Sequence, residues 1–236
     1  MKAINSYIIL LIIFTVNSFS QEKSWIVGAD ASYNLPVGSL SHRFLGNFGF
    51  LVYAGKNTSE HWTWVGKFEY FNLNTINEDY MNKTVITEEF GVVKEYKFNL
   101  PDLKMDMKIA GLSFEARYKL FSSDIFNADL NLGFGFYYWE HFRSSYYDSL
   151  YADTTGQDDL VLVEVLNVPE LEQKDWSGGI NVGGDFNFTI VDPVQLNLGF
   201  NYKIIIAELW PTLALNLESI SGLQFLEIRA GLRVKL

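Results

Sequence analysis

The sequence of 236 residues predicts an all-β fold: an eight-stranded antiparallel transmembrane up-and-down β-barrel with long outer loops. Three observations lead to this prediction. Apolar and polar residues alternate with a period of two, in segments long enough for the roughly 9–11 tilted residues that cross a bilayer. The connections between these segments are alternately long and short. Tryptophans fall near the segment ends, where interfacial solvation favours aromatic rings.

Eight segments carry the alternation, in the order 25–34, 44–54, 62–74, 108–121, 127–139, 179–191, 194–207 and 223–236. Segment 194–207 (VQLNLGFNYKIIIA) is the clearest, because Leu196, Leu198 and Phe200 fall on one face while Asn197, Gly199 and Asn201 fall on the other. Segments 127–139 and 179–191 repeat this split, and Asn-Leu-Gly-Phe occurs at both 131–134 and 197–200. Such a pattern is typical of strands with one apolar and one polar face.

The connections support mutual pairing of the eight segments. They run 35–43, 55–61, 75–107, 122–126, 140–178, 192–193 and 208–222, and they contain all five prolines: Pro36, Pro101, Pro169, Pro193 and Pro211. Proline cannot donate to a sheet ladder, so this placement fits paired strands. If the first strand runs outward, Trp25, Trp62 and Trp64 lie at periplasmic ends, and Trp139, Trp176 and Trp210 lie at outer ends. Strict alternation turns Trp139 inward.

Charge is distributed unevenly along the chain. The net charge is −10, and most of the excess acid falls in loops 75–107 and 140–178. Nucleic acid is therefore not an expected partner, since phosphate binding requires clustered Lys and Arg. The absence of cysteine excludes disulfides, thiolate metal sites and cysteine nucleophiles.

Charges within the strands fall mainly on the polar face and carry both signs: Asp30, Lys67, Glu69, Glu115, Arg117, Lys119, Asp129, Asp185, Lys203, Glu227, Arg229, Arg233 and Lys235. Eight strands enclose an interior just wide enough for side chains to fill. Unpaired buried charges are costly, so these groups should pair with one another. We expect Lys203, Arg229 and Arg233 to pair with Glu115, Asp129, Asp185 or Glu227, which gives a packed polar interior and no water-filled pore.

Residues 1–20 have the pattern of a secretory signal peptide. Lys2 precedes an apolar run at 7–16, and Ser18 and Ser20 supply small residues at positions −3 and −1 before Gln21. Because no cysteine lies at the junction, no lipid anchor is expected. The remaining residues, 21–236, form the expected barrel domain.

The signal peptide, the eight alternating strands and a last strand that ends at the final residue together resemble the small outer-membrane β-barrel domain family of Gram-negative bacteria. The resemblance covers residues 24–236 and rests on the pattern and on the terminal Gly-Leu-Arg-Val-Lys-Leu, where Leu236 replaces the usual aromatic residue. It implies a location in the cell outer membrane, in contact with its lipid. It also implies a role without an assigned activity or one that accompanies secretion or surface machinery. No periplasmic peptidoglycan-binding domain is expected after the last strand.

Histidine and serine residues near the outer rim are the candidate catalytic groups. His42 and His141 could approach one another, with Ser39, Ser41, Ser144 and Ser145 nearby, whereas His61 lies in a turn on the periplasmic side. A hydrolase would need Ser, His and a carboxylate within hydrogen-bond reach. No spacing singles out a nucleophile, so we expect solvated loop residues, no catalytic site and no enzyme.

An acidic stretch at 153–159 (DTTGQDD) offers oxygen ligands of the kind that Ca²⁺ or Mg²⁺ prefers. Its spacing does not match the alternating acidic positions of an EF-hand loop. A solvated acidic loop is therefore the favoured interpretation, and we expect no metal site and no cofactor.

The two acidic loops also contain β-branched runs, at 84–96 and 160–166. These runs fit either local packing over the barrel mouth or strands that continue beyond the membrane as a projecting sheet, whose edge could accept a partner strand.

The favoured function is a non-enzymatic outer-membrane β-barrel that binds a protein partner through loops 75–107 and 140–178, as an accessory subunit of a surface or secretion complex. Two alternatives remain. One is a narrow ion or solute channel, and the other is a rim-located enzyme that modifies lipid or cleaves protein.

Overall fold

A computed structural model describes residues 24–89, 92–100, 102–153 and 160–236. The expected signal peptide at 1–20 lies outside the described residues, as does most of the acidic stretch at 153–159. Among the described residues, no helix is long and apolar enough to cross a membrane.

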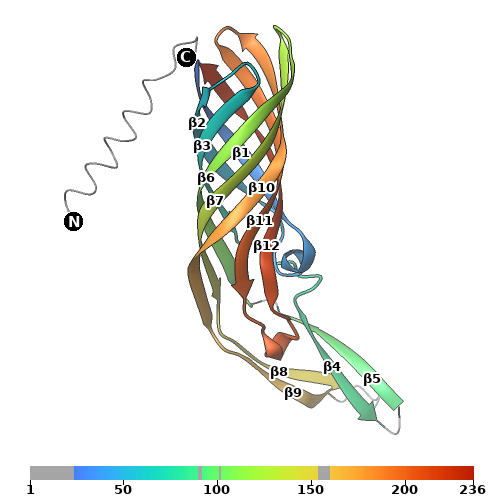
Figure 1. The fold of residues 1–236 in the computed structure, drawn as a ribbon. Helices are drawn as coiled ribbons and strands as arrows, with labels where there is room; N and C mark the ends of the chain where they lie inside the picture. The colour runs from blue at the N-terminus through green and yellow to red at the C-terminus, as the bar shows by residue number, and fades with distance from the viewer. Residues whose placement is uncertain (1–23, 90–91, 101, 154–159) are drawn as a thin grey trace, which may run out of the picture.

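In this part of the chain, eight antiparallel strands close into one barrel, as predicted (Figure 1). They are β1 (Trp25–Pro36), β2 (Asn47–Asn57), β3 (Trp62–Leu73), β6 (Met105–Ser122), β7 (Phe126–Arg143), β10 (Leu171–Val191), β11 (Val194–Leu209) and β12 (Ile220–Lys235). The first and last strands close the wall in a continuous register from Ile26↔Lys235 to Pro36↔Phe225. Closure leaves no open edge in hydrocarbon, where unpaired backbone groups would be costly.

The strand bounds differ from the predicted ones mainly at one end of the barrel. Strands β6, β7 and β10 contain 18, 18 and 21 residues, because their pairing continues to Met105↔Arg143 and Leu171↔Arg143. Strand β2 begins at Asn47 and not at Phe44, since a 3₁₀ turn, η1 (Gly38–His42), comes first and Phe44 forms an isolated bridge with Ile76. A second 3₁₀ turn, η2 (Leu213–Leu215), lies between β11 and β12.

Two hairpins extend from the same end of the barrel (Figure 1). One consists of β4 (Asn82–Glu89) and β5 (Val92–Asn99), and the other of β8 (Tyr146–Asp153) and β9 (Leu160–Val168). Each is a two-stranded sheet of its own, and the two share a buried apolar cluster: Val85, Leu100, Leu103, Tyr146, Leu150, Leu166, Val168 and Leu215. The described parts of the β-branched runs thus belong to projecting strands that are also packed locally.

Long connections at one end and short turns at the other define the orientation, because barrels of this kind have short periplasmic turns and longer outer loops. The hairpins therefore lie outside. Outward-facing side chains of the strands are apolar and exposed, for example Leu132, Phe134 and Ile228. Trp176 and Trp210 are exposed toward the outer end, whereas Trp139 is buried, as its inward alternation predicted.

Candidate functional site

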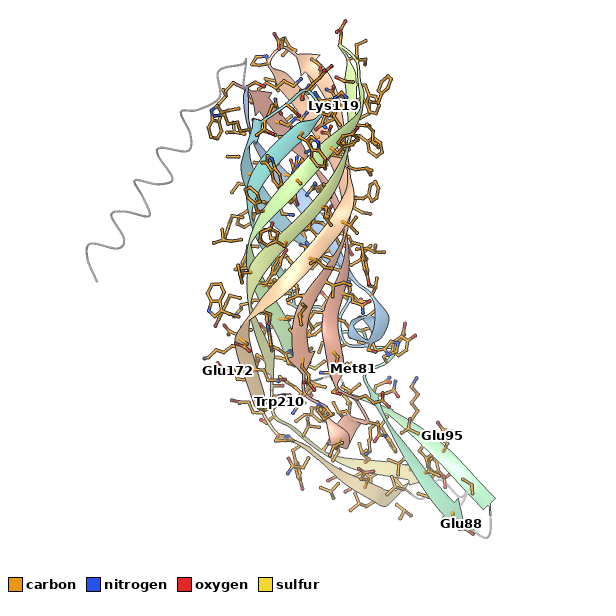
Figure 2. All side chains as sticks on the ribbon, in the orientation of Figure 1. Met81, Glu88, Glu95, Lys119, Glu172 and Trp210 are labelled. Carbon is orange, nitrogen blue, oxygen red and sulfur yellow. The ribbon has the colours of Figure 1, made fainter. Side chains whose placement is uncertain are left out.

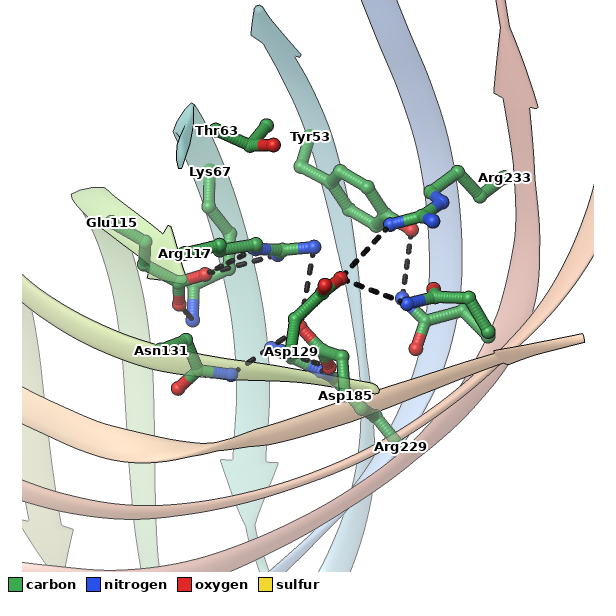
Figure 3. A network of polar contacts seen from close by, with 12 residues as sticks. Tyr53, Thr63, Lys67, Glu115, Arg117, Asp129, Asn131, Asp185, Arg229 and Arg233 are labelled. Atoms are coloured by element: carbon green, nitrogen blue, oxygen red, sulfur yellow. Dashed lines mark hydrogen bonds and ion pairs between the residues drawn. The ribbon is translucent and has the colours of Figure 1, made fainter. Parts of the chain in front are cut away.

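Charged side chains fill the membrane-level interior of the barrel (Figure 3). Asp185 is the centre of one group. It accepts a hydrogen bond from Arg229 Nη2 at 2.6 Å and lies 3.2 Å from Arg117 Nη1. Arg117 also pairs with Glu115 at 3.0 Å, and Glu115 accepts a 2.7 Å hydrogen bond from Lys67 Nζ. All five side chains are almost fully buried, so each charge is compensated by a neighbour on the same or another strand.

A second group joins the first through Arg229. Lys203 Nζ donates to Glu227 at 2.9 Å and also to Glu69. Glu227 lies 3.4 Å from Arg229 Nη1, which links the two groups into one network. The predicted ion pairs of Lys203 with Glu227 and of Arg229 with Asp185 are confirmed. The sequence had not identified Glu69 as a second partner of Lys203.

Arg233 lies nearer the periplasmic end and completes the predicted set. Its Nη2 donates to Gln195 at 2.7 Å, and its Nη1 lies 3.6 Å from Asp129. Opposite charges thus occupy the interior across several strands, as the mixed signs on the polar faces predicted.

Toward the outer end, the interior changes from charged to apolar. The cluster there consists of Leu40, Phe44, Phe71, Leu73, Met81, Met105, Met107, Ile109, Tyr137, Trp139, Ile205, Leu209, Ile220, Leu223 and Phe225. The prediction of a polar interior along the whole barrel is therefore wrong for its outer half. A signal existed in the sequence, because Ile204, Ile205 and Ile206 break the alternation by placing apolar side chains on both faces of one strand.

Two buried arginines tie the outer loops to the rim. Arg43 donates to the carbonyl of Glu218 at 2.6 Å, and Arg143 donates to the carbonyl of Pro169 at 2.9 Å and to Thr212 Oγ1. Burial, with Arg143 nearby, lowers the pKa of Arg43 to about 10. These contacts hold the β11–β12 connection over the barrel mouth.

The histidine and serine candidates do not form a catalytic group. Exposed His42 stacks on Tyr80 with ring centroids 4.3 Å apart, while His141 is fully buried and its Nδ1 lies 3.1 Å from the carbonyl oxygen of Asp106. Ser41 Oγ donates to the carbonyl of Gly38, and Ser144 Oγ accepts from the backbone N–H of Lys104.

His141 lies outward of the lipid-facing part of β7, whose last exposed apolar residue is Phe136, followed by half-buried Tyr138 and Glu140. Burial lowers its pKa to about 4, so the ring is neutral at pH 7. His61 lies at the opposite end beside Tyr118, as expected from its turn. The described residues include no group of three or more His, Cys, Asp or Glu side chains that could hold a metal ion.

The β8–β9 hairpin has one packed face and one exposed apolar face. Tyr146, Leu150, Leu166 and Val168 belong to the buried cluster between the hairpins. The exposed face, which we call the hairpin strip, consists of Tyr147, Tyr151, Leu160, Leu162 and Val165. Tyr147 and Leu160 are 71% and 69% exposed, and the strip lies beyond the barrel, away from the lipid-facing wall.

A closed antiparallel wall of eight strands, an apolar outer surface, a charge-paired interior and long connections at one end define a class of protein. The chain is a small outer-membrane β-barrel, and its location is the outer membrane.

No family model matches the sequence, and no curated protein is similar to it. Solved structures with a similar course of the chain include neisserial surface protein A, with 15% identity over 92% of this chain and 100% of that chain, at a TM-score of 0.45. The attachment invasion locus protein Ail of Yersinia pestis has 11% identity over 92% and 100% of the two chains, at a TM-score of 0.43. A major outer membrane protein from Thermus thermophilus has 9% identity over 92% and 100%, at a TM-score of 0.47.

Proposed function

We propose that this barrel is a non-enzymatic surface protein that binds a protein partner through its outer hairpins, as an accessory subunit of a surface or secretion complex. The hairpin strip carries the proposal. Contiguous exposed apolar side chains outside the lipid-facing wall are typical of sites for protein contact. Tyrosine is also enriched where such contacts form, since its ring is apolar and its hydroxyl tolerates water.

The charge of the outer loops indicates the kind of partner. Acidic residues predominate in loops 75–107 and 140–178. A partner with an apolar contact face surrounded by Lys and Arg would complement this surface and would be steered toward it.

The filled interior supports a role at the surface over the channel alternative. Buried ion pairs span the membrane-level interior, and the apolar cluster and the arginine-held loops lie above them. His42 stacks on Tyr80 and His141 packs against Phe44, which likewise gives no support to a rim hydrolase.

Photo-crosslinking in intact cells tests the proposal. A photoreactive amino acid in place of Tyr151 should capture one defined protein, identified by mass spectrometry. The triple variant Tyr147→Ser, Leu162→Ser, Val165→Ser, with the probe still at position 151, should lose that product. The matched control replaces exposed apolar residues of the other hairpin, Ile86→Ser and Val93→Ser, and should retain it. Capture that is equal in all three proteins would contradict the proposal.

A further inference from the structure

Strands β10 and β11 separate at the outer end of the barrel wall. They pair from Val191↔Val194 to Gly179↔Ile205. Beyond that point, residues 171–178 of β10 pair with β7 alone, whereas Glu208 and Leu209 of β11 pair with β12. Figure 1 shows β10 bending away from β11 in this region. Two neighbouring strands of the wall therefore have facing edges without a ladder between them.

A cleft of about 680 Å³ occupies this place, which we call the β10–β11 cleft. Residues 172–175 and Ser177 of β10 form one side, residues 206–208 and Trp210 form the other, and Trp139, Ser221 and Gly222 complete the lining. Figure 2 shows Glu172 and Trp210 at the hairpin end of the barrel. The volume is within the range of roughly 300–1,000 Å³ that is usual for specific binding clefts.

The direction of the backbone groups of β10 follows from one hydrogen bond and from the β7–β10 register. Thr189 N–H donates to the carbonyl of Ile125, on the β7 side, and the β7–β10 register runs without a shift from Phe188 to Leu171. In an antiparallel strand the backbone groups of successive residues point to alternate sides. Even-numbered residues of β10 therefore point away from β7.

The hydrogen bond of Trp176 agrees with this assignment, because its N–H donates at 2.7 Å to its neighbour's side-chain oxygen, Asp175 Oδ1. The backbone groups of Glu172 and Lys174 share that side and face the β10–β11 cleft. An edge of this kind is a template for an added strand.

The charge and polarity of the lining specify the added strand. Glu172, Asp175 and Glu208 outnumber Lys174 among the charged residues of the cleft. Ile206 and Trp210 are well exposed beside it and offer apolar contacts. A segment that alternates basic and apolar side chains would satisfy both features while its backbone pairs with β10.

We propose that the β10–β11 cleft binds an extended basic peptide segment, which pairs as an additional strand with residues 172–176 of β10. This site is separate from the hairpin strip, so either proposal can fail without the other.

Peptide binding to the detergent-solubilised full chain tests the inference. The probe is a fluorescein-labelled octapeptide of alternating Lys and Val, followed by fluorescence anisotropy. The comparison peptide has the same sequence with N-methyl groups on alternate residues, on the side that must pair. If electrostatic attraction alone caused binding, both peptides would bind equally, whereas strand pairing requires the backbone N–H groups of the peptide. We expect the methylated peptide to bind at least about tenfold more weakly.

Two substitutions at one position separate the backbone from the side chain. Lys174→Pro removes a cleft-facing N–H and leaves the groups that pair with β7 in place, since proline is tolerated where the N–H faces an open edge. It should weaken binding of the unmethylated peptide at least about tenfold. Lys174→Ala keeps the N–H and removes a positive charge, so affinity should be unchanged or higher.

Equal binding of the two peptides would overturn the inference, as would equal effects of the two substitutions or no binding at about 1 mM peptide. The peptide comparison uses the unaltered protein, so it decides the question even if the proline variant does not fold.

Discussion

The same strands line both the periplasmic half and the outer half of the barrel interior, but their inward side chains are charged in the first and apolar in the second. At membrane level, Lys203 and Glu227 face inward and form an ion pair. Further out on the same two strands, Ile205 and Phe225 face inward and pack in an apolar cluster. Each strand keeps its period of two across this change, and only the polarity of its inward residues differs.

The difference shows that alternation determines which side of the wall a residue occupies, and not what the inside is made of. Within the membrane, the outward face must be apolar, so polarity can distinguish inside from outside. The inward face is under no such constraint, so an apolar cluster can stabilise the barrel there as in a water-soluble domain. The charged layer fixes partners through directional ion pairs, whereas the apolar layer depends on volume.

Replacement of a network member should give the largest loss of stability. Arg229→Met keeps much of the volume but leaves Asp185 with Arg117 as its remaining cation and removes one partner of Glu227. Removing one partner of a buried ion pair typically costs about 3–5 kcal/mol. Urea unfolding in lipid vesicles, followed by tryptophan fluorescence, measures this loss. A loss below about 1 kcal/mol would show that the charged layer is not tightly coupled.

A charge on the outer side of the wall should cost slightly less. Leu232 faces lipid, and it lies four residues before Leu236, which pairs with Trp25 at the periplasmic end. At about 3.3 Å per residue and a tilt near 40°, that places it roughly 10 Å into an apolar band of about 25 Å.

Leu232→Arg should therefore lower the free energy of unfolding by about 2–4 kcal/mol. The neighbouring change Arg233→Gln is the control, because Arg233 faces inward and pairs with Gln195 and Asp129. It should cost less in the same unfolding measurement. The reverse order would mean that the two faces are assigned incorrectly.

The sequence predicted the wall well and the outer end poorly. Positions such as Arg229 and Ile228 were assigned to opposite faces because lipid imposes one polarity on the outer side. The same rule could not place Phe225 or Ile205 in an apolar cluster, since it fixes the polarity of the outward face and not that of the inward face.

Contacts between distant loops were also beyond the sequence. The sequence allowed His42 and His141 to approach one another, and it indicated neither the stacking of His42 on Tyr80 nor the burial of His141 beside Phe44. Such positions depend on links like Arg43 to Glu218, which no local pattern reveals. The β10–β11 cleft likewise results from where the pairing of the two strands stops, at Gly179↔Ile205.

The outer half should be sensitive to acid through His141. Its pKa is lowered to about 4 by burial, against about 6.5 in the unfolded chain. A lowered pKa contributes stability that is present above about pH 6.5 and is lost as pH falls toward 4. At pH 5 this residue should reduce the free energy of unfolding by about 2 kcal/mol relative to pH 7.

The variant His141→Gln isolates that contribution, because glutamine can donate to the carbonyl of Asp106 but does not titrate. Acidic loops contribute their own pH dependence to both proteins, so the relevant quantity is the difference between the two unfolding curves. Identical pH dependence in both would contradict a neutral, buried His141.

Within the apolar cluster, a change of shape should be tolerated. Phe225 packs edge-on against Phe71 with ring centroids 5.1 Å apart. Phe225→Met conserves most of the volume, so it should cost about 1 kcal/mol. Arg229→Met, measured in the same urea series, introduces the same residue into the charged network, so the two variants compare one substitution in the two layers. Equal losses of unfolding free energy in the two variants would show that the charged layer is no more dependent on directional pairing than the apolar layer.

The smallest effect should come from the acid that the network holds least tightly. Asp30 is almost fully buried, but no residue in the described part of the chain donates a hydrogen bond to either carboxylate oxygen, and its ion pair is with Arg229 Nε at 3.9 Å. Asp185, by contrast, accepts a 2.6 Å hydrogen bond from the same arginine and lies 3.2 Å from Arg117. Burial of a carboxylate costs desolvation free energy whether or not the group is paired, so the weakly paired one contributes little net stability.

Asp30→Asn should change the free energy of unfolding by no more than about 1 kcal/mol in either direction, whereas Asp185→Asn should cost about 3–5 kcal/mol. The two isosteric substitutions are compared by urea unfolding at pH 7. A loss at Asp30 as large as that at Asp185 would mean that Arg229 depends on both acids, and that the charged layer extends to β1.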